Sequence, residues 1–132
     1  MKSRQIKQKD FDLILKQDKM VYPTDSPVTK KILTTWFQNN PEFGIIFKEK
    51  NKIVGNCIVI PLNKRGWTKL VNGKLNESDL NEKTIFNNKR DNKVGIQIYH
   101  IEKLDLKIKG LYINCLKKIS KNIKDLKKTT PN

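Results

Sequence analysis

The sequence predicts an α+β fold in which helices pack on a mixed, mostly antiparallel β-sheet. Two segments in the first 40 residues repeat their apolar side chains at helical spacing, whereas residues 43–60 and 94–103 read as strands. A third helical repeat follows the last strand. Helices and sheets must each bury an apolar face, so this order favours one sheet with helices packed on it.

The chain begins with a predicted edge strand and a first helix. The segment of residues 4–6 is short and contains one apolar side chain, which is typical of an edge strand. Asp10 can cap the helix that follows. Phe11, Ile14 and Leu15 fall at positions i, i+3 and i+4, so they share one helical face.

A second helix is predicted after a proline-rich loop. Ser26 followed by Pro27 reads as the N-cap and the first helical position, because proline lacks only an N–H group that has no helical partner there. Pro41 marks the end of this helix. Its core face is an apolar stripe of Val28, Ile32, Leu33, Trp36 and Phe37.

The central part of the chain predicts a β-hairpin followed by a long irregular segment. Residues 43–47 and 53–60 are rich in β-branched and aromatic side chains, and the polar residues 48–52 connect them. Residues 63–92 carry several turn signals and no clear period. Because long loops in small domains are often functional, this segment is a candidate binding region.

The last third predicts the longest strand and an amphipathic helix. Simple alternation along residues 94–103 places four side chains on one face of the strand, namely Ile96, Ile98, His100 and Glu102. After Gly110, one helical face carries Tyr112, Leu116, Ile119, Ile123 and Leu126. Residues 1–128 are therefore expected to form a single domain, with 129–132 as a tail.

The net charge is +15, from 28 basic and 13 acidic residues, which first indicates a nucleic-acid binder. However, the basic residues are 25 lysines and only three arginines, and the chain contains no alanine. This composition is typical of an AT-rich coding sequence. Base reading and stacking usually use arginine or exposed aromatic residues, so a small basic nucleic-acid-binding protein remains only the less favoured alternative.

Several other classes are disfavoured by the sequence. No apolar run approaches the about 18 residues of a membrane span, and no signal peptide follows Met1. Cys57 and Cys115 cannot form a disulfide framework, and we expect them to be buried thiols in a cytoplasmic protein. With one histidine and two isolated cysteines, no metal site is predicted.

The turn before the last helix has the chemistry of a phosphate site. A helix N-terminus offers unpaired N–H groups and a positive dipole end, and Gly110 allows a phosphate to approach the backbone. Lys107 and Lys109 flank this turn. They either contact the phosphate or are solvated side chains of a lysine-rich chain.

Residues 94–116 resemble the acetyl-CoA site of GNAT-superfamily N-acetyltransferases, and the upstream order of strand, two helices and hairpin also fits. The family pattern is Gln or Arg, two residues, Gly, one residue, then Gly or Ala. Lys107 occupies the first position, Gly110 the second, and Tyr112 stands where Gly or Ala is expected. In the family another strand, a helix and a hairpin follow, so the resemblance implies a short or C-terminally truncated relative.

The resemblance implies an enzyme that transfers acetyl from acetyl-CoA to a small-molecule or protein amine. Strand-end backbone would pair with pantetheine, and the turn would hold the pyrophosphate. The residues so assigned to acetyl-CoA are Glu102, Lys103, Leu104, Lys107, Ile108, Lys109, Gly110, Leu111 and Tyr112.

Glu102 and His100 are the candidates for the base that deprotonates the incoming ammonium group. Both can equally be ordinary polar residues at a strand end. Trp67 either forms a wall of the acceptor pocket or anchors its loop. The alternative function is a catalytically silent module that binds CoA or a protein, with pairing at the strand edge allowing a homodimer.

Overall fold

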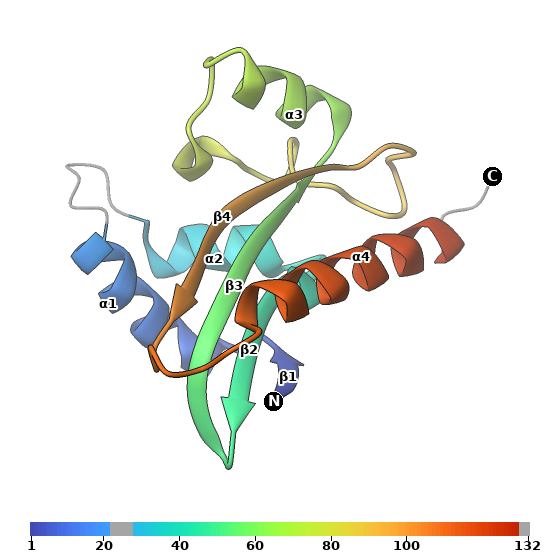
Figure 1. Ribbon diagram of the computed structural model, residues 1–132. Helices are drawn as coiled ribbons and strands as arrows, with labels where there is room; N and C mark the ends of the chain where they lie inside the picture. Colours follow the sequence, from blue (N-terminus) through green and yellow to red (C-terminus); the bar gives the residue numbers. More distant parts are fainter. Residues whose placement is uncertain (22–27, 130–132) are drawn as a thin grey trace.

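The computed structural model describes residues 1–21 and 28–129, which form a four-stranded antiparallel sheet with helices on both faces (Figure 1). The strand order is β1-β2-β3-β4, and each neighbouring pair is antiparallel. The α+β class and the layered arrangement are therefore confirmed. The sequence predicts a mixed sheet that is mostly antiparallel. In the described residues every strand pairing is antiparallel, and no parallel pair occurs.

The chain forms one strand, two helices, a two-stranded hairpin, a helix, a strand and a final helix, with three short 3-10 turns between some of them. The turns are Gln8–Asp10, Pro41–Phe43 and Glu77–Asp79. The main elements are β1 (Lys2–Gln5), α1 (Phe11–Val21), α2 (Lys30–Phe37), β2 (Gly44–Glu49), β3 (Lys52–Leu62), α3 (Lys64–Val71), β4 (Gly95–Lys103) and α4 (Leu111–Thr129).

β1 is the edge strand that the sequence predicts, and an ion pair ties it to the start of α1. The Asp10 carboxylate accepts two hydrogen bonds from the Arg4 guanidinium, at 2.8 and 2.9 Å. It also accepts the Lys7 N–H at 2.8 Å. Asp10 therefore joins β1 to the 3-10 turn that leads into α1, and its carboxylate caps that turn through the Lys7 N–H.

α2 begins later than predicted. Ser26 and Pro27 lie outside the described residues, and the helix starts at Lys30. Its N-cap is Thr29, whose hydroxyl oxygen accepts the Ile32 N–H at 3.3 Å. The side chains of Leu33, Trp36 and Phe37 are buried, as the apolar stripe predicts.

The hairpin is confirmed, and a two-residue turn closes it. Lys50 and Asn51 both have positive φ, at 49° and 66°, which suits a tight turn between twisted strands. Alternate residues of β2 and β3 then enter two separate cores. Ile46, Ile58 and Ile60 pack under α1 and α2, whereas Ile45, Phe47, Cys57 and Val59 pack under α4.

Residues 63–92 are more ordered than the sequence suggests, because α3 lies within them. The Asn63 side chain caps this helix by accepting the Gly66 N–H at 2.9 Å. Gly66 hides the helical pattern, and its small size is required, because a Cβ there would lie 2.5 Å from the Thr84 carbonyl oxygen. The segment then returns to the sheet, where Ile85 forms a bridge with Leu62.

A β-bulge in β4 makes the predicted strand faces wrong. Ile98 pairs with Val59 and His100 with Ile58, so Tyr99 is an extra residue. Before the bulge, Ile96 and Ile98 lie on the α4 side of the sheet. After it, His100 and Glu102 lie on the side of α1, together with Tyr99.

The buried face of α4 also differs from the prediction. Tyr112 and Leu116 are 52% and 56% exposed. The inward face consists of Leu111, Cys115, Ile119, Asn122 and Leu126. The predicted stripe is therefore rotated by about 60° from this face, whereas Ile119 and Leu126 are buried and Ile123 packs on the core as predicted. Thr129 ends α4 instead of starting a tail, and residues 130–132 lie outside the described residues.

Candidate functional site

The residues predicted to bind the cofactor lie in one continuous segment. This segment comprises the end of β4, the turn after it and the start of α4. Glu102 and Lys103 are half-buried at the end of the strand, and Leu104 N–H donates to the Val54 carbonyl at 2.9 Å. Lys107 and Lys109 are exposed, and Ile108 between them packs against the α4-side core. The turn is thus anchored by an apolar residue and presents two cations to solvent.

Gly110 has the left-handed conformation that a close-approach turn requires. Its φ is +77°, and a Cβ at this position would face open space except for the Asn114 side-chain nitrogen at 3.6 Å. The Gly110 carbonyl accepts the backbone and side-chain N–H groups of Asn114, at 3.0 and 2.9 Å. These bonds fix the first turn of α4.

The first N–H groups of α4 lack helical acceptors. Asn114 N–H is the first that bonds back to Gly110, so the N–H groups of Leu111, Tyr112 and Ile113 have no intrahelical acceptor. Leu111 is fully buried and holds the helix end in place against Gly55. The positive end of the helix dipole adds to the charge of the neighbouring lysines.

Tyr112 does not turn toward the core. Its ring lies beside the end of β4, with the Lys103 ammonium 5.4 Å from the ring centroid. The aromatic ring therefore flanks the turn, and it helps to position a cation there.

His100 lies in a buried polar cluster between β3, β4 and α1. Its Nε2 is 2.9 Å from Oδ1 of Asn56, whose amide nitrogen donates to Oε1 of Gln17 at 2.7 Å. His100 Nδ1 and Gln17 Nε2 are buried and have no hydrogen-bond partner. Burial lowers the pKa of His100 to about 4, although the nearby Asp18 charge acts in the opposite direction.

Glu102 lies on the same face as His100 but is more accessible. It pairs in register with Asn56 and is half-buried. The bulge residue Tyr99 donates its hydroxyl to Asp18 on α1 at 2.6 Å. The structure therefore brings both predicted base candidates together, next to the polar face of α1.

Three polar residues of this cluster are not predicted from the sequence, namely Gln17, Asp18 and Asn56. Asn56 carries the one usable signal, because it interrupts the apolar run of β3 and is fully buried. A buried amide needs hydrogen-bond partners. Gln17 and Asp18 look like ordinary polar residues of an amphipathic helix, so only the packing of α1 on the sheet reveals them.

Trp67 is not part of this group. It lies on α3, is 45% exposed, and its ring covers Gly95 at the start of β4. Glu102 is seven residues further along the strand, which corresponds to roughly 23 Å. Trp67 thus packs on the beginning of β4 and does not line the same site.

The thiols and the other titratable residues form no metal centre in the described part of the chain, where no cluster of three or more ligand side chains occurs. Cys57 and Cys115 are both fully buried and contact each other between β3 and α4. Hydrogen bonding to Cys115, together with burial, raises the pKa of Cys57. The expectation of buried thiols is confirmed.

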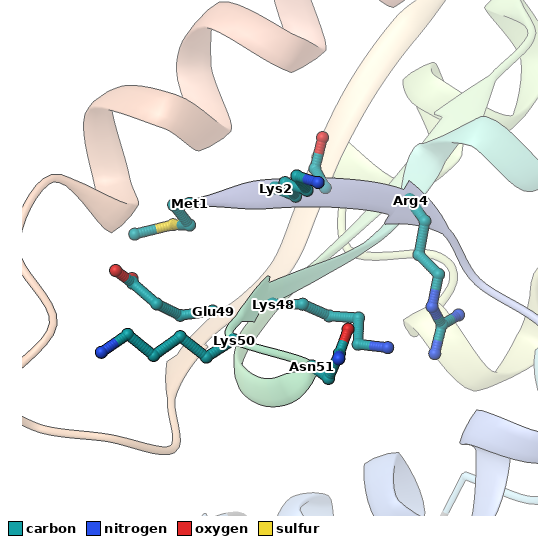
Figure 2. Close-up of a pocket in the computed structure, with 8 residues that line it drawn as sticks. Met1, Lys2, Arg4, Lys48, Glu49, Lys50 and Asn51 are labelled. Carbon is teal, nitrogen blue, oxygen red and sulfur yellow. The ribbon is translucent and has the colours of Figure 1, made fainter.

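A separate hollow lies at the opposite edge of the sheet. Figure 2 shows it between β1 and the β2–β3 turn. Its volume is about 510 Å³, and Lys2, Arg4, Lys48, Glu49 and Lys50 are among the residues that line it. Two strands, β2 and β3, lie between β1 and β4 in the sheet, so this hollow lies at the edge opposite β4.

Among the described residues, no helix combines the length and apolar character needed to cross a membrane. No protein-family model, curated protein or solved structure matches this chain.

Proposed function

We propose that this domain binds acetyl-CoA and transfers its acetyl group to an amine, as the resemblance to GNAT-superfamily N-acetyltransferases implies. One observation carries the proposal. An exposed sheet edge, the outer side of β4, leads directly into a turn with a positive-φ glycine and into the N-terminus of a 19-residue helix. This is an arrangement that can hold an extended thiol arm and a pyrophosphate side by side.

The residues of the turn fit the phosphates. Tyr112 and Ile113 are exposed and their N–H groups have no helical acceptor, and a Cβ at Gly110 would face open space, which leaves room for a phosphate beside them. Lys107 and Lys109 supply positive charge. Tyr112, which replaces the small residue of the family pattern, has its ring beside the Lys103 ammonium at the end of β4.

The end of β4 fits the thiol arm and the reacting group. Residues 100–103 offer outward backbone groups that can pair with the amides of pantetheine. A strand N–H in this position can polarise the thioester carbonyl, and holding both substrates in place supplies much of the rate. Acetyl-CoA contributes the activated acyl group, and the chain contributes orientation.

Glu102 is the better candidate for the base. His100 is 5% exposed, its Nε2 is bound to Asn56, and its pKa of about 4 makes it a weak proton acceptor near neutral pH. Glu102 is only half-buried and can reach an amine from solvent. We assign His100 to positioning, because it fixes Asn56 opposite Glu102.

A silent CoA-binding module is the second candidate, and the placement of Trp67 favours it. The sequence leaves open whether Trp67 forms a wall of the acceptor pocket or anchors its loop, and this residue packs on the far end of β4. On this second proposal, the segment from β4 to α4 binds CoA, and Trp67 takes no part in binding an acceptor.

The proposal is tested by thermal unfolding with acetyl-CoA and CoA. A ligand that binds only the native state stabilises it by about 2.7 kcal/mol at a hundredfold excess over Kd, so a clear rise in Tm is expected. Gly110→Val should abolish the rise, since a β-branched residue is strained at φ +77° and blocks the turn.

The matched control is Gly73→Val, which places the same strain at φ +72° beside α3. It should lower the starting Tm but keep the ligand-induced rise. No rise in wild type at millimolar ligand would exclude CoA binding. If the rise occurs, release of CoA thiol with a panel of amines separates an enzyme from a silent binder, and Glu102→Gln should slow that release by 10- to 1,000-fold.

A further inference from the structure

The two edges of the sheet differ in how they resist pairing with another chain. β1 has four residues, and two of them are the cations Lys2 and Arg4. β4 has nine residues, carries no proline and has no charged side chain before Glu102. Short, charged edge strands avoid association, whereas long uncharged ones invite it. The described part of the sheet therefore has one protected edge and one open edge.

Exposed apolar residues gather beside the open edge. Ile98 pairs with Val59 on the α4 side of the sheet and is 44% exposed, so α4 leaves this part of the strand uncovered. Tyr112 at the start of α4 is next to Lys103 at the end of β4, so the helix and the strand edge adjoin. We call this the β4–α4 surface, and it comprises Ile98, Leu104, Tyr112, Ile113 and Leu116, which are 39–61% exposed.

The surroundings of this surface are strongly basic. Eight lysines and three acids lie between residues 93 and 126. On α4, a shallow hollow of about 430 Å³ continues from Leu116 and is lined by Lys117, Ser120, Lys121 and Lys124. A second copy of this +15 chain would bring like charges together, whereas an acidic chain would be attracted.

We propose that the β4–α4 surface is the docking site of an acidic polypeptide, which adds a β-strand along Gly95–Ile98 at the open edge of β4. Its backbone pairs with the outward N–H and carbonyl groups of these residues, and alternate apolar side chains cover Ile98 and Leu116. Its carboxylates face the lysines of α4. The bulge at Tyr99 separates the strand pairing along Gly95–Ile98 from residues 100–103. Leu104 and Tyr112 belong both to this surface and to the proposed CoA site, so the peptide and CoA would compete there.

The test uses a capped eight-residue peptide of alternating valine and glutamate, and its counterpart of alternating valine and lysine. Hydrogen exchange of the wild-type protein is followed by NMR. The acidic peptide is expected to slow the fast-exchanging amides of Gly95–Ile98 at least tenfold, and the basic peptide to leave them unchanged. Equal protection by both peptides, protection elsewhere, or none at millimolar peptide would overturn the proposal.

Two substitutions at exposed apolar residues distinguish specific binding at this surface from non-specific hydrophobic binding. Ile98→Lys is expected to weaken binding of the acidic peptide at least fivefold. Val71→Lys on α3, where Val71 is 61% exposed, should leave it unchanged. Circular dichroism checks that both variants fold. Sedimentation without peptide measures the oligomeric state of the wild type and of Ile98→Lys. A wild-type dimer that becomes monomeric in Ile98→Lys would assign the surface to a second copy of the chain and overturn the proposal of an acidic partner.

Discussion

Nε2 of His100 lies 2.9 Å from Oδ1 of Asn56, and both side chains are buried between the sheet and α1. Asn56 uses its amide nitrogen to donate to Gln17, so its oxygen must accept from the imidazole. The proton of neutral His100 is therefore on Nε2. Since the chain has one histidine, its titration can be observed without interference.

We expect His100 to titrate near pH 4 in the folded protein, and near its ordinary pKa of 6.5 when unfolded. Between these values only the unfolded chain takes up the proton, so the free energy of unfolding falls as the pH is lowered, by about 3 kcal/mol in total. NMR of the imidazole and urea unfolding at pH 7 and pH 4 measure both quantities. His100→Gln should lose this part of the pH dependence, and a native pKa near 6.5 would contradict the buried environment.

Removing the Asp10 carboxylate should destabilise the protein in a pH-dependent way. Burial alone would raise the pKa of Asp10, but the hydrogen bonds from Arg4 and Lys7 outweigh it and the pKa is lowered. Its stabilisation is thus present above the unfolded pKa of about 3.9 and is lost as the pH falls through the lower folded value. We expect Asp10→Asn to cost about 1.5–3 kcal/mol at pH 7.

The control for Asp10 is Asp12→Asn. Asp12 pairs with Lys30 at 2.9 Å, but both side chains are largely exposed, so the loss should be much smaller. Urea unfolding of both variants at pH 7 and pH 2.5 makes the comparison. If both cost the same at pH 7, the tie between β1 and α1 does not contribute to stability as proposed.

Gly95 and Trp67 should be energetically coupled. A Cβ at Gly95 would lie 2.2 Å from Cδ1 of Trp67, so Gly95→Ala has to displace the indole, and we expect a cost of about 1–3 kcal/mol. Adding Trp67→Ala should recover most of that cost in a double-mutant cycle measured by urea unfolding. Strictly additive effects would show that the ring does not rest on the strand.

The thiols should be inert in the native protein. Cys57 and Cys115 are both fully buried, which keeps a reagent away from them. The raised pKa of Cys57 also keeps that thiol protonated, whereas hydrogen bonding with Cys57 lowers the pKa of Cys115, so burial is what protects Cys115. A chromogenic disulfide reagent should therefore label no thiol on the timescale of minutes, and two per chain in guanidinium chloride. Fast labelling of the folded protein would mean that the contact between β3 and α4 opens readily.

Much of the fold follows from local patterns. Helical spacing identifies α1, α2 and α4, and β-branched runs identify the hairpin and β4, because each pattern reflects burial of one face. α3 is hidden because Gly66 and Lys64 look like turn residues, and its glycine is required by the tertiary contact with Thr84. Ser26 and Pro27 suggest that α2 starts earlier than it does. Serine and threonine are both good N-cap residues, and the helix uses Thr29.

The site is predictable only where it depends on consecutive residues. The Gly110 turn and its lysines lie within one short segment, so their placement together follows from chain continuity. Which side chains share a face of β4 does not follow from chain continuity. One extra residue at Tyr99 reverses the alternation, and no sequence signal marks this bulge. Gln17, Asp18 and Asn56 meet His100 through packing between distant elements, which periodicity alone does not determine.

The most direct test of the proposed acetyl-CoA site is an NMR titration of ¹⁵N-labelled protein with acetyl-CoA. We expect the largest amide shifts at Gly110, Leu111 and Tyr112, with smaller shifts along residues 100–103. Shifts confined to the basic hollow around Lys2, Lys48 and Lys50, or no shifts at millimolar ligand, would contradict the assignment of the cofactor site to β4 and α4.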